Sequence, residues 1–191
     1  MPATSVRPLA PDDASAYRAL RLAGIAELPA AFCTTHAAES GLPLAQIAQR
    51  LRATSYRIIF GAFNEEQLIA IAGLRREPIA VVHDKASLWG MYVAPQARGR
   101  GAGRQLVQAA IDHACAIPEL ARIRLAVAQD NHAALTLYLA CGFTLADCPA
   151  ADGMLQMQLL LPRPARASAS ASPSAESNVF MKINTLQIPA K

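Results

Sequence analysis

The stretch from Leu88 to Cys115 constrains the fold of this chain more than any other part of the sequence. It begins with an apolar, aromatic and β-branched run from Leu88 to Val93, which is typical of a largely buried strand. A glycine-rich segment with two arginines follows at residues 98–103. From Gly103 onward, apolar residues recur at helical spacing with polar residues between them. The stretch therefore predicts a strand, a glycine-rich turn and an amphipathic helix.

This order of elements is typical of a site for an anion, and a diphosphate fits it well. The N–H groups in the first turn of a helix have no partner inside the helix, and the helix dipole adds partial positive charge there. Glycines let the backbone approach a ligand without a Cβ in the way. We therefore expect a diphosphate site formed by the residues of this turn and helix start: Arg98, Gly99, Arg100, Gly101, Ala102, Gly103 and Arg104.

Two common nucleotide-binding loops do not fit the glycine-rich segment. A Walker loop ends in Gly-Lys-Ser/Thr, and no lysine follows Gly103. A Rossmann loop spaces its glycines as Gly-x-Gly-x-x-Gly, whereas these glycines stand at alternate positions. The remaining alternative is a surface turn with solvated arginines, and the flanking strand and helix argue against it.

A second informative segment runs from Asp130 to Phe143. Asp130 or Asn131 is placed to cap a helix, and Gly142 supplies a left-handed exit from it. The helical spacing predicts a buried face made of Ala134, Leu137, Tyr138 and Cys141.

Both segments resemble motifs of the GNAT superfamily, the Gcn5-related N-acetyltransferases. Arg98-x-x-Gly101-x-Gly103 matches the Arg/Gln-x-x-Gly-x-Gly/Ala signature, and the run from Asn131 through Tyr138 to Phe143 resembles the second motif. The resemblance covers about residues 4–161. It implies an α/β (α+β) fold with a mixed, mostly antiparallel central sheet of six to seven strands, splayed in the middle and flanked by about four helices. It also implies acetyl-CoA as the co-substrate.

The resemblance also implies roles for individual residues. Tyr138 matches the family tyrosine that donates a proton to the departing sulfur, although a tyrosine at helical spacing is also typical of a core. Asn131 would contact the arm of the coenzyme, with helix capping as its local alternative. The backbones of Met91 and Val93 would pair with the pantetheine amides, and an N–H there would stabilise the oxyanion.

The general base is not determined by the sequence. Many family members carry a glutamate near the start of the central strand, where this chain has Leu88-Trp89-Gly90. The open candidates are solvent water and the side chains of His36, Glu39, Glu77, His83 and Asp84.

The function expected from these residues is that of an N-acetyltransferase, an acyltransferase that moves an acetyl group from acetyl-CoA to a primary amine by direct attack in a ternary complex. A covalent acyl-cysteine is disfavoured because Cys141 has no neighbouring base in sequence. Two alternatives remain open. One is a non-catalytic acyl-CoA-binding or regulatory domain, and the other is an acetyltransferase acting on an RNA-linked amine, which the net charge of +4 suggests.

Composition limits the other possibilities. No apolar run is long enough to span a membrane, the N-terminus lacks the apolar core of a signal peptide, and the four cysteines show no Cys-x-x-Cys spacing. We therefore expect a cytoplasmic protein without a metal site or a membrane partner. Nucleic acid is disfavoured as the main partner because no lysine run is present. The acceptor would be a small-molecule or peptide amine, and a homodimer stays open.

The chain divides into an expected acetyltransferase domain at 1–161 and a low-complexity tail at 162–191, disordered or loosely docked. Segment 29–41 is predicted to be irregular. A helix from Pro43 to Arg52 would bury Leu44, Ile47, Ala48 and Leu51. The remaining elements predicted are a strand at 4–9, a helix from Asp12 to Pro29, a hairpin of 57–63 with 67–74, and strands at 123–127, 143–146 and 154–161.

Overall fold

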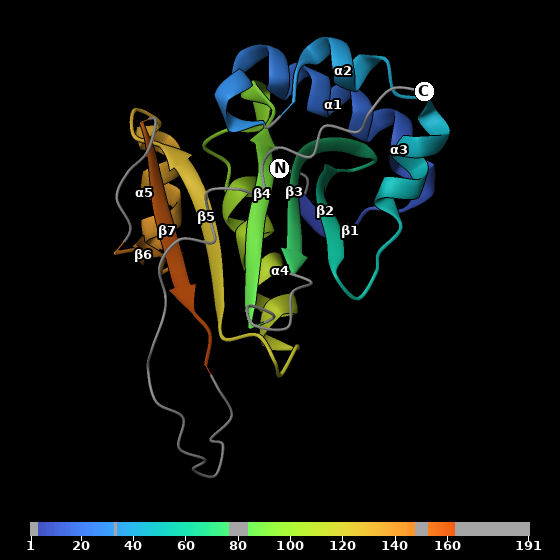
Figure 1. The fold of residues 1–191 in the computed structure, drawn as a ribbon. Coiled ribbons are helices and arrows are strands. Elements are labelled where there is room, and N and C mark those ends of the chain that lie inside the picture. The colour runs from blue at the N-terminus through green and yellow to red at the C-terminus, as the bar shows by residue number, and fades with distance from the viewer. Residues whose placement is uncertain (1–3, 33, 77–83, 148–152, 163–191) are drawn as a thin grey trace, which may run out of the picture.

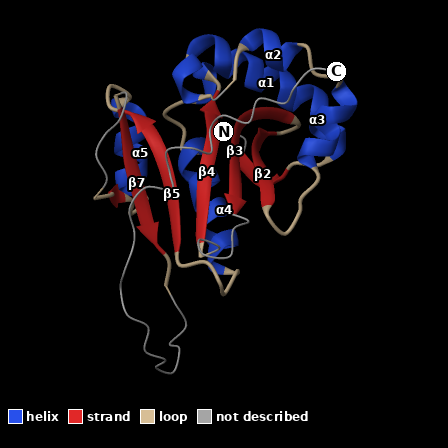
Figure 2. Ribbon diagram, viewed as in Figure 1, coloured by secondary structure: helices blue, strands red, loops and turns tan. Residues whose placement is uncertain are grey.

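The computed structural model describes residues 4–32, 34–76, 84–147 and 153–162, which form one sheet with helices on both faces (Figures 1 and 2). The strands are β1 (Thr4–Pro8), β2 (Arg57–Asn64), β3 (Gln67–Arg76), β4 (Lys85–Val93), β5 (Arg122–Ala128), β6 (Thr144–Leu145) and β7 (Met154–Leu160). The α-helices are α1 (Ala14–Glu27), α2 (His36–Ser40), α3 (Leu44–Leu51), α4 (Ala102–Cys115) and α5 (His132–Ala140). Short 3-10 turns lie at Pro11–Asp13, Pro29–Ala31 and Pro95–Ala97.

The strand order is β1-β2-β3-β4-β5-β7-β6, and every neighbouring pair is antiparallel except β4 with β5. In the described part of the chain, β4 and β5 pair only over Lys85–Ser87 and Arg122–Arg124. Toward their carboxyl ends the two strands separate (Figure 1). The predicted mixed, mostly antiparallel and centrally splayed sheet is thus confirmed.

The sheet is buried on both faces by two apolar clusters. One packs under α4 and includes Leu106, Val107 and Ile123, none of which is measurably exposed. The other lies under α1 and α3 and includes Tyr17 and Ile47. Residues of the central strands alternate between the two clusters, which is why β2 and β3 read as almost continuous apolar runs.

A β-bulge interrupts β4 at Gly90 and Met91. Trp89 pairs with Gly73 and Tyr92 pairs with Ile71, so two residues of β4 stand opposite a single residue of β3. Gly90 has a φ of +60°, a conformation that glycine adopts without steric cost. The bulge lies where β4 has already left β5, at the open part of the sheet.

Two local predictions were wrong. Segment 29–41, predicted to be irregular, contains the short helix α2, because the Thr35 hydroxyl accepts a hydrogen bond from the Ala38 N–H at 3.2 Å and caps it. Leu44, predicted to be buried, is 42% exposed because it is the first residue of α3, whereas Ile47 and Leu51 are fully buried. The tail from residue 163 and the segment 77–83 lie outside the described residues. No helix in the described ranges has the length and apolar character to cross a membrane.

Candidate functional site

The first turn of α4 lies beside the open part of the sheet and presents unpaired amides. The first helical bond is donated by the Gln105 N–H to the Gly101 carbonyl at 3.0 Å, so the amides of the preceding helical residues have no partner within the helix. Gly101 caps the helix with a φ of +84°, and Gly99 has a φ of +71°. Apart from the adjacent residues in sequence, no atom of the described chain lies within 4 Å of where a Cβ would stand at either glycine. Ala102 points into the core instead.

The three arginines of this turn have different surroundings. The Arg98 guanidinium lies 2.7 Å from a Glu27 carboxylate oxygen, and its Nε donates to the Val93 carbonyl at 3.0 Å. Tyr92 donates to the same carboxylate at 2.7 Å, and the hydrogen bonds from Tyr92 and Arg98 lower the pKa of Glu27. Arg98 therefore ties the turn to β4 and α1, and it occupies the Val93 carbonyl expected to pair with a pantetheine amide.

Arg100 and Arg104 are exposed, and neither has an ion-pair partner within the described part of the chain. They are the positive charges of this turn that a bound diphosphate can reach without displacing a carboxylate.

Tyr138 on α5 is in direct contact with Met91 on β4. The Tyr138 hydroxyl donates to the Met91 sulfur at 3.4 Å, and its ring packs against Phe143 with a centroid distance of 5.8 Å. A Cβ at Gly103 would lie 3.2 Å from the Met91 side chain and 3.2 Å from Leu137. Glycine at position 103 thus lets α4, β4 and α5 converge, and it brings Tyr138 close to the diphosphate turn.

Burial controls the protonation of Tyr138. The side chain is 7% exposed, and loss of hydration raises the pKa of Tyr138 to about 12. The phenol therefore keeps its proton throughout the neutral and moderately alkaline range. It can act as a hydrogen-bond donor toward a negative charge that forms beside it.

Asn131 caps α5, since its side-chain oxygen accepts a hydrogen bond from the Ala134 N–H at 3.1 Å. This contact uses the oxygen and leaves the amide NH₂ to face other groups. Both alternatives raised for Asn131 are therefore compatible, because a capping oxygen and a donating amide belong to the same side chain.

A cavity of about 290 Å³ opens on the other face of the sheet, beside α1, α2 and α3. We call it the arginine cavity. Its lining residues are Arg21, Thr34, Glu39, Arg50, Arg57, Arg75 and Trp89. A Cβ at Gly90 would lie 3.1 Å from an Arg21 nitrogen, so a lining residue of the cavity lies next to the β4 bulge.

A buried ion triad forms one wall of this cavity. Glu39 is 2% exposed, and one of its carboxylate oxygens lies 3.1 Å from Arg21 Nε and 2.5 Å from an Arg50 nitrogen. Arg21, 7% exposed, also stacks over the Phe32 ring at 5.0 Å. The triad connects the three consecutive helices α1, α2 and α3.

The candidates for the general base differ in their distance from the β4 bulge. His36 is exposed on α2, and Asp84 lies 3.7 Å from Arg122 at the opposite end of β4 from the bulge. Glu77 and His83 lie outside the described residues. Of the described candidates, Glu39 alone lines the cavity beside the bulge, and there it is held by two guanidinium groups.

Trp89 forms another wall and depends on Gly73 beneath it. A Cβ at residue 73 would lie 2.3 Å from the indole ring, which is a severe overlap. We expect Gly73→Ala to displace the ring and lower the free energy of unfolding by about 1–3 kcal/mol. Trp89 is the single tryptophan of the chain, so its fluorescence reports the displacement directly. Gly41→Ala, at a position with a φ of −74°, should change neither fluorescence nor stability appreciably; equal effects of the two substitutions would contradict the prediction.

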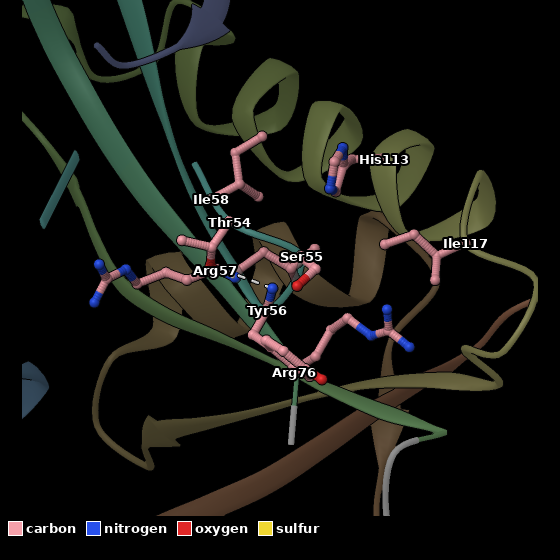
Figure 3. A pocket seen from close by; sticks show the side chains of 9 residues that line it. Thr54, Ser55, Tyr56, Arg57, Ile58, Arg76, His113 and Ile117 are labelled. Atoms are coloured by element: carbon pink, nitrogen blue, oxygen red, sulfur yellow. Dashed lines mark hydrogen bonds between the residues drawn. The ribbon is translucent and has the colours of Figure 1, made fainter. Parts of the chain in front are cut away.

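A second hollow, between β2 and the end of α4, is too small to hold a substrate (Figure 3). It is lined by Tyr56, Arg57, Arg76 and His113 among others, and its volume of about 10 Å³ accommodates one water at most. In the described ranges, no group of three or more histidine, cysteine or acidic side chains is placed to hold a metal ion.

Sequence reasoning missed both the bulge and the arginine cavity. The bulge had a local signal, because a glycine inside a strand pattern often marks one. The cavity had none, since its arginines come from four separate elements and meet only through the sheet register and helix packing.

The family model that matches the chain is that of the acetyltransferase (GNAT) family, over residues 23–143, which is more than half of the chain. No curated protein matches the chain in sequence. The acetyltransferase of the GNAT family from Streptococcus pneumoniae is similar in structure, with a TM-score of 0.71 and 20% identity over 84% of this chain and 100% of that one.

Two further solved structures are similar and contain the coenzyme. They are yncA of Salmonella typhimurium with its cofactor acetyl-CoA (TM-score 0.70, 18% identity, 88% of this chain and 99% of that one) and the paia N-acetyltransferase of Thermoplasma acidophilum with coenzyme A (TM-score 0.62, 18% identity, 82% and 98%). At these identities the structural likeness shows the fold.

Proposed function

This chain belongs to the GNAT family of acetyltransferases, which use acetyl-CoA, and we propose that it moves the acetyl group to a primary amine by direct attack in a ternary complex. The observation that carries the proposal is the separation of β4 from β5. Two neighbouring features support it: the amides of the first turn of α4 have no partner within the helix, and the protonated Tyr138 contacts Met91 on β4. A second cavity reaches the same strand from the other face.

The turn before α4 is suited to hold the coenzyme diphosphate. The unpaired amides of its first turn and the exposed charges of Arg100 and Arg104 can bind an anion, and Gly99 and Gly101 present no Cβ that would hinder its approach. Beyond Ser87, β4 has an edge that does not pair with β5 in the described part of the chain, and this edge can accept the pantetheine amides as an added strand. Arg98 would support the turn rather than grip the phosphates, because Glu27 holds it.

The bulge and Tyr138 would act on opposite sides of the reacting thioester, which supplies an activated acetyl group. A bulge leaves a backbone group of the extra residue unpaired, and the N–H of Met91 is the donor we assign to the carbonyl oxygen. Tyr138 would donate a hydrogen bond to the sulfur as negative charge develops there.

The amine must lose a proton before it attacks, because a lysine-like amine has a pKa of about 10.4. Glu39 is shared between two guanidinium groups, so we assign the proton to water in the arginine cavity rather than to this carboxylate. The water then passes the proton to bulk solvent. The amine nitrogen would bond to the acetyl carbon and release its second proton to the same water as the carbon–sulfur bond breaks. The thiolate of coenzyme A would take a proton from bulk solvent, or from Tyr138, which would regain one from solvent.

Calorimetric titration with coenzyme A, followed by a thiol-release assay with acetyl-CoA and a panel of amines, tests the proposal. Tight binding with thiol release that depends on the amine supports it. Binding without release by any amine would instead favour the non-catalytic acyl-CoA-binding role. Release that requires an aminoacylated RNA, with a steep salt dependence, would favour the RNA-linked acceptor. Absence of binding at millimolar coenzyme would overturn all three.

Replacing both Arg100 and Arg104 by glutamine should weaken coenzyme A binding by about 10-fold, because each loses a charge-assisted hydrogen bond in a solvated site. The loss should shrink as salt is raised, since exposed charges are screened. Arg52→Gln removes a similarly exposed guanidinium at the end of α3 and serves as the control. An unchanged dissociation constant in the double variant would show that the arginines do not contact the diphosphate.

A further inference from the structure

The arginine cavity contains more positive charge than its own carboxylate can balance. Among the residues that the structure describes, four arginines but a single carboxylate line it. That carboxylate, Glu39, is already shared by Arg21 and Arg50. Arg57 and Arg75 have no ion-pair partner among the described residues. No described carboxylate therefore compensates the part of the cavity over β2 and β3.

Arg57 and Arg75 stand directly opposite each other on antiparallel β2 and β3. Their side chains project from the same face of the sheet, about 5 Å apart at Cβ, where two like charges repel. Such a pair destabilises a sheet unless an anion lies between the two groups. Two guanidinium groups at this spacing can share one carboxylate or phosphate, each with parallel N–H donors.

The polar atoms left unsatisfied in the cavity wall are all donors. Arg21 Nη1, Arg57 Nε and Trp89 Nε1 are buried without a hydrogen-bond partner in the described part of the chain. Each belongs to a residue that lines the cavity. Buried donors without partners are rare in folded proteins, and these can be satisfied only by a ligand or water that brings acceptor atoms.

We infer that the amine acceptor carries an acidic group, a carboxylate or a phosphate, which binds between Arg57 and Arg75 while the amine lies at the Gly90–Met91 bulge. The inference rests on the proposed function and names the acceptor class for it. Arg75 pairs with Ser87, four positions before Met91, which is roughly 13 Å along the strand. The reach of the arginine side chains shortens this span, so the amine and the acid are separated by several bonds.

The size of the cavity favours a small molecule. A volume of about 290 Å³ equals that of roughly ten waters in the liquid and lies at the small end of ligand pockets. A free amino acid of the ω-amino type fills such a volume. Polyamines are disfavoured, because their second ammonium group would lie against two guanidinium groups.

The test uses four amines with chains of similar length that differ in the charge of their other terminal group. They are 5-aminopentanoate, its neutral amide 5-aminopentanamide, the diamine 1,5-diaminopentane and the phosphonate 4-aminobutylphosphonate. Each is titrated by calorimetry into the full chain saturated with coenzyme A, where no transfer can occur, and each is then assayed with acetyl-CoA. We expect the two acids to bind about 10- to 100-fold more tightly than the amide, and the diamine most weakly. The ratio between carboxylate and phosphonate identifies which acid the site prefers.

Arg57→Gln and Arg75→Gln should each reduce the preference for acid over amide by about 10-fold and leave the affinity for the amide unchanged. Arg52→Gln, which lies outside the cavity, should keep the full preference. Equal binding of acid and amide by the unmodified chain would overturn the inference, as would variants that weaken both probes equally. Should a variant fail to fold, the comparison of probes on the unmodified chain decides alone.

The two proposals fail separately in this design. Selective binding of acids without acetylation of any probe would refute acetyl transfer to an amine and leave the acidic-ligand site standing. Acetylation of amide and acid with equal kcat/KM, together with equal affinities, would support acetyl transfer to an amine and refute the acidic-ligand site.

Discussion

Replacing Tyr138 by phenylalanine is expected to lower the turnover number by about 100-fold while the affinity for coenzyme A stays within about threefold of the original. The hydroxyl is the group that would stabilise the sulfur, whereas the ring provides the packing against Phe143. Phenylalanine keeps the ring and loses only a 3.4 Å contact to the Met91 sulfur. The free energy of unfolding should therefore fall by about 1 kcal/mol or less.

The pH profile provides an independent readout of Tyr138. Burial raises the pKa of Tyr138 to about 12, so the donor stays protonated where an ordinary tyrosine, with a pKa near 10, would ionise. The rate should rise as the acceptor amine loses its proton and should not decline near pH 10. Tyr56→Phe alters a tyrosine that is 52% exposed and should leave rate and profile unchanged. Full turnover in Tyr138→Phe would remove the hydroxyl from the mechanism.

Replacing Glu39 by glutamine is expected to lower the free energy of unfolding by about 3–5 kcal/mol. The substitution keeps the side-chain shape but leaves Arg21, only 7% exposed, beside no carboxylate. A buried guanidinium without its counter-ion retains the cost of leaving water and loses the attraction that offset it. Urea unfolding followed by circular dichroism measures the change.

Glu119→Gln is the matched control for Glu39. Glu119 is 52% exposed and lies 3.7 Å from Arg76, so the loss should be about 1 kcal/mol or less. Combining Glu39→Gln with Arg21→Met should recover part of the stability, because an apolar side chain of similar length removes the uncompensated charge. Equal destabilisation by the two glutamine substitutions would show that the triad does not hold α1, α2 and α3 together.

The parts of the fold that could be predicted are those whose signals are local. Two apolar runs joined by the short polar turn at 64–66 predicted the β2–β3 hairpin, and Gly142, with a φ of +88°, does end α5 in the left-handed conformation expected of it. The strand, turn and helix around Gly101 were predicted because glycine spacing and amphipathic spacing act within a few residues of each other.

The features that escaped prediction depend on contacts distant in sequence. Arg98 lies in a motif that suggests a phosphate ligand, yet its partner Glu27 is 71 positions away at the end of α1. Arg57 and Arg75 became neighbours only through the register of the hairpin, and the cavity formed only once α1, α2 and α3 had packed over it. A motif identifies residue types, while tertiary packing decides which charges remain available.

The parallel pairing of β4 with β5, which covers only Lys85–Ser87 on β4, makes the middle of the sheet its weakest junction. It divides the sheet into two halves, β1 to β4 and β5 to β7. In the described part of the chain, few backbone hydrogen bonds join the two halves. A coenzyme arm that pairs along β4 would add hydrogen bonds at an edge where β4 does not pair with β5. The hydrogen bonds that bind the coenzyme would then also hold the two halves of the sheet together. The free energy of unfolding should therefore rise when coenzyme is bound, by an amount set by its concentration and dissociation constant.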